Sequence, residues 1–164
     1  MWPEVEQVLS KHRYELILSG APLRQYLTSN NELDPTIWTL TQLNFLEISQ
    51  CSLVVSLPDG IGKLANLSTL SLTSNLLERI PDEMKNLHNL RHLDLSFNQL
   101  SKLPDDLFLQ LSHLETLNLS NNRLEEVAPF SVENKRLAIV NLSHNQLQSL
   151  HDFPNNLENL SQLD

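Results

Sequence analysis

The sequence of 164 residues predicts an α/β solenoid with a parallel concave sheet, short helical or 3-10 convex turns and an N-terminal helical cap. Leucine contributes 37 residues and asparagine 17, whereas the chain holds 3 glycines and 1 cysteine. The pattern LxxLxLxxNxL also recurs at intervals of 23 or 24 residues, which is typical of stacked units. So few glycines and cysteines exclude a glycine-rich nucleotide loop, a disulfide framework and a multi-cysteine zinc site.

The repeat divides the chain into an N-terminal region, residues 1–42, and an array of units over residues 43–164. Within each LxL segment the two leucines face inward and the residue between them faces outward, because strand side chains alternate between faces. One unit cannot bury its leucines alone, so stacking is needed to form a continuous core. Six strands are predicted, one in each of the units that begin at Leu43, Leu67, Leu90, Leu114, Leu137 and Leu160.

The segments that return from one strand to the next contain proline, as in LPDGIGKL, IPDEMKNL and LPDDLFLQL. Because the fixed φ of proline suits a first helical position, each segment is expected to form one helical or 3-10 turn on the convex side. The last two return segments, VAPFSVENKRL and LHDFPNNLENL, place proline differently. Less regular turns are expected in these two units.

A column of asparagines occupies the point where the chain leaves each strand. Their amides are expected to bind backbone groups of neighbouring turns, because an amide offers both donors and an acceptor. The first full unit has Cys51 at this position, interpreted as a small buried residue. The structural column comprises Asn75, Asn98, Asn122 and Asn145.

The N-terminal region, residues 1–42, is predicted to combine a cap helix with an extended first repeat. The helix is expected over Pro3 to His12, with Val5, Val8 and Leu9 facing inward and Trp2 over the open end of the core. Leu16 and Leu18 occupy strand positions, and Asp34 followed by Pro35 is typical of a helix N-cap and first helical residue. A solenoid needs such a cap to cover its first apolar face.

The C-terminal end of the array has no comparable cap in the sequence. The chain stops at LSQLD, which opens a further unit, so Leu160 and Leu163 are expected to leave part of an apolar edge exposed. The expectation is therefore that the array is truncated and that the natural protein continues beyond Asp164.

These units resemble the leucine-rich repeat family, and the resemblance covers roughly residues 13–164. The IPDEM and LPDDL turns are similar to those of intracellular signalling scaffolds of the Ras-pathway type. The N-terminal segment WPEVEQVLSKHRYELILSGAPL, followed by LTQLNFLEISQCSL, resembles a translation-linked branch of the family. The residues that carry this second match are Trp2, Pro3, Glu4, Glu15, Leu16, Gly20, Leu46, Glu47, Ser49 and Cys51.

That branch adds a domain similar to the B3/B4 region of the phenylalanyl-tRNA synthetase β subunit. This chain contains no such segment, so no tRNA-related or ligase activity transfers to it. The resemblance implies a cytosolic protein linked to translation, of which this chain is the repeat domain.

The outward strand positions form a candidate binding surface on the concave face. Aromatic and charged residues are favoured there as anchors, because such residues dominate protein interfaces. The candidates are Phe45, Glu47, His92, Asp94, Phe97, Asn118, Arg123, Asn141 and His144. An alternative for Phe97 is that it covers the edge of the core. A neighbouring column of Ser49, Thr73, Ser96, Ser120 and Ser143 is interpreted as small polar filler.

Composition and motifs favour a non-catalytic protein-interaction module with no cofactor. The net charge of −9 disfavours direct binding of nucleic acid, and the apolar runs are too short to span a membrane. Neither a catalytic signature nor a spaced set of metal ligands is recognisable. We expect a protein partner and a cytoplasmic location, with the nucleus as the alternative location. Alternative functions are a Ras-pathway type scaffold or an accessory domain of an RNA-associated factor.

Overall fold

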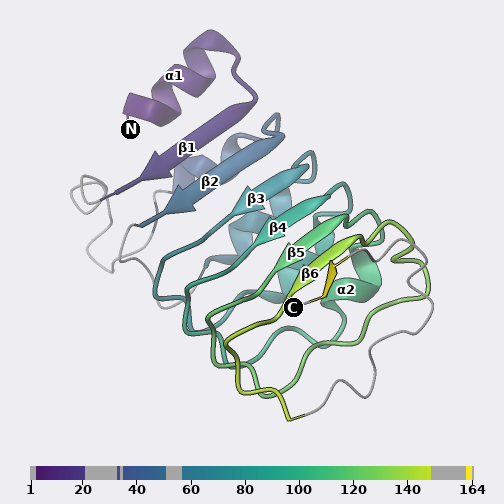
Figure 1. Cartoon of the computed structure of the whole chain (residues 1–164). Helices are drawn as coiled ribbons and strands as arrows, with labels where there is room; N and C mark the ends of the chain where they lie inside the picture. The colour runs from purple at the N-terminus through teal and green to yellow at the C-terminus, as the bar shows by residue number, and fades with distance from the viewer. Residues whose placement is uncertain (1–2, 21–32, 34, 51–56, 149–161, 164) are drawn as a thin grey trace.

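The computed structural model describes residues 3–20, 33, 35–50, 57–148 and 162–163. Across these residues, seven strands form one parallel sheet in the order β1 to β7 (Figure 1). The strands are β1 (Glu15–Ser19), β2 (Phe45–Ser49), β3 (Thr69–Ser71), β4 (His92–Asp94), β5 (Thr116–Asn118), β6 (Ile139–Asn141) and β7 (Gln162–Leu163). The six strands expected from the repeats are present, and the N-terminal region supplies the seventh as β1.

The helical elements are α1 (Pro3–Lys11), η2 (Pro35–Thr39), η3 (Asp59–Lys63), η4 (Asp82–Asn86) and α2 (Leu107–Gln110). Figure 1 shows α1 beyond β1 at one end of the sheet and the other helical segments behind the strands. The leucine-rich repeat solenoid predicted from the sequence is therefore confirmed.

The strands stack in one uniform register. Leu70 pairs with Leu46 of the preceding strand and with Leu93 of the following strand. Leu117 and Val140 continue the same line, and all five of these side chains are essentially inaccessible to solvent. Because the register never shifts, every outward side chain also lies directly beside its equivalent in the next unit.

The asparagine column joins neighbouring units where the chain leaves each strand. Asn98 Nδ2 donates to the backbone oxygens of Leu72, 2.9 Å away in the preceding unit, and of Leu95, 3.0 Å away in its own unit. Its Oδ1 accepts from Leu77 N at 3.1 Å. Equivalent bonds to both units are made by Asn75, Asn122 and Asn145. Cys51 lies outside the described residues.

The prolines of the convex side occupy two different positions. Pro35 is the first residue of η2, as expected. Pro58 and Pro81 instead precede η3 and η4 as N-caps with extended ψ values of 153° and 154°. Their carbonyls accept from Ile61 N at 3.1 Å and Met84 N at 3.2 Å. The expectation of a first helical position was wrong at these two sites, because the tight turn needs only the proline carbonyl as its first acceptor.

The unit that begins at Leu114 lacks a convex helix, as its displaced proline predicts. The return segment between Leu124 and Leu137 contains turns only. Its Phe130 ring instead stacks on Phe108 of α2, with ring centres 4.5 Å apart and planes within 4°. The second segment expected to be irregular, residues 150–160, lies outside the described residues.

The N-terminal cap is formed by α1. Val5 and Val8 are buried against the core, whereas Leu9 is 42% exposed, so the prediction that Leu9 faces inward was wrong. The contact stripe of a nine-residue helix is narrow, and the side of α1 that carries Glu4 and Val8 faces β1, which turns Leu9 away. Trp2 and Asp34 lie outside the described residues.

Candidate functional site

The concave face carries three lines of side chains that run across the strands. The first line, the entry column, contains the first residue of each strand from β2 to β6: Phe45, Thr69, His92, Thr116 and Ile139. Phe45 and His92 are half-buried, and Ile139 is 39% exposed. His92 Nδ1 lies 2.9 Å from Thr116 Oγ1, which holds the imidazole against the next strand.

The second line, the polar column, contains the central outward residues Glu47, Ser71, Asp94, Asn118 and Asn141. Asp94 Oδ1 accepts two bonds from Ser96, from its hydroxyl at 2.6 Å and its backbone N–H at 2.9 Å. Asn118 and Asn141 accept the same two bonds from Ser120 and Ser143. Each polar side chain is thereby fixed in one orientation before any partner arrives.

The serines that make these bonds do more than fill space. This differs from their interpretation, from the sequence, as small polar filler. Ser49, Ser96 and Ser120 are each at most 4% exposed. Their hydroxyls turn toward the preceding polar side chain, and the Ser49 hydroxyl donates to Glu47 Oε1 at 2.7 Å. Each of these serine hydroxyls thus supports the outward side chain two positions earlier in the chain.

Asp94 and Asn118 are also coupled across the strands. The Asn118 Nδ2 donates to Asp94 Oδ2 at 3.3 Å, so the carboxylate accepts bonds from two units. Asp94 is half-buried, and its carboxylate is surrounded by donors rather than by other acids. It therefore presents a negative charge whose position is set by Ser96 and Asn118.

The third line, the left-handed row, consists of residues that follow the strands with positive φ. Its members are Gln50, Ser74, Phe97, Asn121 and His144, with φ between 53° and 58°. Phe97 is 57% exposed and has a φ of 55°, a backbone conformation that is uncommon for a bulky residue. This exposure argues against the alternative that Phe97 covers the edge of the core.

The predicted candidates are therefore brought to one face at different depths. Phe45, Glu47, His92, Asp94, Asn118 and Asn141 are half-buried on the strands, and Phe97, Arg123 and His144 are exposed along the edge where the chain leaves the sheet. Arg123 is anchored through its backbone N–H, which donates to Leu100 O at 2.9 Å, and the residue is exposed. Their roles in binding stay predictions.

The sequence places Leu76 on this surface without marking it as an anchor, and it gives no sign of the role of Asn134. Leu76 is 44% exposed and adds a second apolar group beside the left-handed row. Asn134 is fully buried, and its Nδ2 donates to Phe108 O at 3.1 Å and Leu111 O at 3.0 Å. No local pattern marks Asn134, because its acceptors lie 23 and 26 residues earlier in the chain.

Among the described residues, one ion pair, Arg91 with Glu115, joins the positions just before β4 and β5, and the others lie in the return segments of the convex side. Lys85 Nζ is 2.9 Å from Asp106 Oδ2. This hydrogen-bonded pair raises the pKa of Lys85 and lowers the pKa of Asp106. A second pair, Lys102 and Asp105 at 3.1 Å, raises the pKa of Lys102 in the same way. The Lys85–Asp106 pair links two convex segments and the Lys102–Asp105 pair lies within one, and because both are largely open to solvent each contributes little to stability.

Within the described part of the chain, acidic, histidine and cysteine side chains form no group of three or more that could hold a metal ion. None of the helices described there is both long and apolar enough to cross a bilayer.

Comparison with known proteins agrees with this geometry. A family model described as "Leucine rich repeat" matches residues 41–100 and 88–147. Among solved structures, an internalin of Listeria monocytogenes has a TM-score of 0.65 at 20% identity, covering 92% of this chain and 46% of its own. The leucine-rich repeat domain of a Shigella effector has a TM-score of 0.65 at 23% identity, covering 90% and 56%. At these identities the two likenesses show the fold alone.

A third solved structure is that of the plant peptide hormone receptor RGFR1 in complex with RGF2. It has a TM-score of 0.67 at 34% identity and covers 77% of this chain but 21% of the receptor chain. This chain thus spans little more than half, or less, of the solved proteins that it resembles.

Proposed function

The chain belongs to the leucine-rich repeat family, whose domains are generally protein–protein interaction modules, and on that premise we propose that it binds a protein partner through its concave face. The domain acts by rigid display and takes no catalytic step. The buried leucine ladder sets the curvature of the sheet, and the three concave lines present side chains in fixed positions. Preorganised groups lose less conformational entropy on binding, which favours affinity.

The observation that carries this proposal is the combination of Phe97 with the supported polar column. Phe97 exposes most of an aromatic ring in a backbone conformation that costs free energy, and neither feature helps the free domain to fold. Asp94, three residues earlier in the same unit and on β4, offers a fixed charge to orient the partner. An aromatic anchor beside an oriented charge is typical of a protein-binding hot spot.

The plant receptor that resembles this chain is recorded with a peptide hormone bound, which supports a partner of peptide or protein chemistry. The N-terminal segment of this chain resembles that of leucine-rich repeat-containing protein 47. We therefore extend the proposal to a repeat domain of a larger, translation-linked protein of the cytoplasm. The Ras-pathway scaffold remains the second candidate, on the likeness of the IPDEM and LPDDL turns.

The test begins with partner capture on the biotinylated chain, followed by mass spectrometry and measurement of affinity for the recovered partner. Phe97→Ala and Arg123→Ala, both at exposed positions, are expected to weaken that affinity by about tenfold each, as anchors do. Asp94→Asn keeps the shape and the bonds from Ser96 but removes the charge together with the bond from Asn118 Nδ2, so it tests the charge and that support as one unit.

Matched controls on the convex side separate binding from general damage. Leu109→Ala removes an apolar side chain that is 43% exposed, and Arg136→Ala removes an exposed cation. Both should leave affinity unchanged. Equal loss in the concave and convex variants would contradict the concave face as the binding site. Salt-sensitive binding of the chain to single-stranded RNA, with no protein partner captured, would favour the RNA-associated alternative instead.

A further inference from the structure

The outer edge of β1 is the terminus of the parallel sheet. Within the part of the chain that the structure describes, β1 pairs with β2 alone, and its five residues alternate between exposed and buried. Ile17, at its centre, is 53% exposed, and the adjacent Tyr14 is 59% exposed. Sheet edges of this kind present backbone groups that can pair with another chain.

The direction of the backbone groups follows from the bonds on either side of β1. Tyr14 O accepts from the backbone N–H groups of Asn44 and Phe45, and Gly20 N donates to Ser49 O. Because backbone groups alternate in direction along a strand, Leu16 and Leu18 also face β2. The N–H and C=O groups of Glu15, Ile17 and Ser19 therefore face away from the sheet. Among the described residues, α1 makes no backbone hydrogen bond to these three.

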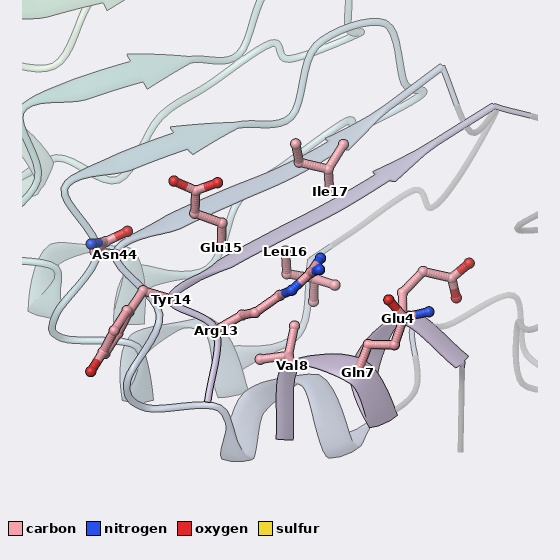
Figure 2. A pocket seen from close by; sticks show the side chains of 9 residues that line it. All are labelled: Glu4, Gln7, Val8, Arg13, Tyr14, Glu15, Leu16, Ile17 and Asn44. Atoms are coloured by element: carbon pink, nitrogen blue, oxygen red, sulfur yellow. The ribbon is translucent and has the colours of Figure 1, made fainter. Parts of the chain in front are cut away.

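A hollow of about 500 Å³ lies along this edge, between β1 and α1. Figure 2 shows Glu4, Gln7 and Val8 on its helical side and Glu15, Leu16 and Ile17 on its strand side. Val8 and Leu16 lie on the floor of the hollow and are each only 2% exposed, so only small side chains fit above them, and the rim is polar. An added strand would place alternate side chains on this floor and the others beside Glu15 and Ile17.

One acceptor in this hollow is unused. Glu4 Oε2 is buried from solvent and has no hydrogen-bond partner among the described residues. A buried carboxylate oxygen without a donor is costly, and a bond from a cationic donor offsets that cost most effectively. Arg13 lines the same hollow but is exposed and makes no recorded ion pair with Glu4. The carboxylate therefore selects for an incoming basic side chain.

We propose that the outer edge of β1 binds an extended peptide segment as an additional strand, with small apolar side chains on Val8 and Leu16 and one basic side chain on Glu4. The backbone groups of Glu15, Ile17 and Ser19 supply affinity, as in other strand-addition complexes. This site adjoins the concave lines, because Glu15 and Ile17 pair with Phe45 and Glu47, but it does not depend on the partner proposed for those lines.

The probes are fluorescein-labelled hexapeptides that alternate valine and threonine, with one lysine moved through the six positions. Anisotropy gives affinity, and amide hydrogen exchange of the 15N-labelled chain locates the contact. We expect one lysine position to bind about tenfold more tightly than its glutamate counterpart, and to slow exchange at Glu15, Ile17 and Ser19. Peptides N-methylated at alternate residues lack the required donors and should not bind.

Variants of the chain complete the test. Glu4→Gln should weaken the lysine peptide about tenfold, whereas Glu6→Gln, an exposed acid on the same helix, should not. Ile17→Pro removes an outward N–H at an edge position that tolerates proline, and should abolish binding with β2 pairing intact. Equal binding by the N-methylated peptides, unchanged exchange at β1, or equal effects of Glu4→Gln and Glu6→Gln would each overturn the proposal.

Discussion

Two units of the solenoid, separated by the unit that begins at Leu90, fill their convex sides in different ways. The unit that begins at Leu67 carries η4, with Met84 buried beneath it. The unit that begins at Leu114 has no helix between Leu124 and Leu137 and relies on stacked rings and one buried amide. Yet the strands of both units pair with their neighbours in the same register.

This difference shows that the concave face is independent of the convex architecture. The leucine ladder and the asparagine column recur in both units, and they alone fix the spacing of the outward side chains. The convex side has only to fill volume and to satisfy backbone groups. A helix does so in one unit, and Phe130 with Asn134 does so in the other.

The largest expected effect comes from removing the α2 ring on which Phe130, of the unit that begins at Leu114, stacks. Phe108→Ala deletes a fully buried side chain and should lower the free energy of unfolding by about 3–5 kcal/mol, measured by urea denaturation. The cost includes the lost contact with Phe130. A loss below about 1 kcal/mol would mean that this unit tolerates cavities and is not packed around the ring pair.

The buried amide of the same unit is the next test. Asn134→Ala leaves the carbonyls of Phe108 and Leu111 unpaired and should cost about 2–3 kcal/mol in urea denaturation. Glu133→Ala, at an exposed neighbouring position, should stay within about 0.5 kcal/mol of the parent chain. Similar values for the two variants would show that solvent replaces the lost bonds.

The packing of the convex helices can be tested by adding a methyl group between two of them. A Cβ added at Gly60 would lie 2.6 Å from Trp38 Cδ1, so η2 and η3 would have to separate. Gly60→Ala should therefore lower the melting temperature and cost about 1–2 kcal/mol, as overpacking does. Ala65→Gly, at an exposed position just after η3, serves as the control. An unchanged melting temperature for Gly60→Ala would show that the convex helices are loosely attached.

The left-handed row allows a gain of stability to be predicted. Asn121 occupies in one unit the position that Phe97 occupies in the preceding one, with φ values of 57° and 55°. Because asparagine tolerates this conformation better than a bulky residue, Phe97→Asn should raise the free energy of unfolding by about 0.5–1 kcal/mol. The same change should weaken the affinity of the concave face for its partner. Loss of stability would indicate that the ring packs more than its exposure suggests.

The smallest expected effect concerns the contribution of the Lys85–Asp106 ion pair to the stability of the convex side. The pKa of Asp106 is lowered by Lys85, so the pair stabilises the fold above the ordinary aspartate pKa and loses this contribution as pH falls through the lowered value. The raised pKa of Lys85 removes it again only at strongly alkaline pH. Asp106→Asn should flatten the acid limb of a stability–pH profile slightly, whereas Ser131→Ala should not. An unaltered acid limb would show that the pair contributes nothing.

The sequence predicts the core of this molecule well because its signal is periodic. The leucines of LxL, the strands and the irregular turn after Leu124 all follow from local spacing. Leu9 was misplaced, because a helical pattern does not say which part of a short helix touches its neighbour. The burial of Ser96 and the role of Asn134 depend on contacts that no local pattern records. The concave candidates share one face, and their selection of a partner stays a prediction.

The unvarying register has a consequence for how such a surface can change. Residues 67–89 form one complete unit, and joining Asn66 directly to Leu90 would place His92 beside Phe45, where Thr69 now lies. The leucine ladder and the asparagine bonds would form again between the two units that become neighbours. All outward side chains of one unit can thus be removed, duplicated or exchanged together. The domain can therefore acquire a new specificity by recombination of units rather than by single substitutions.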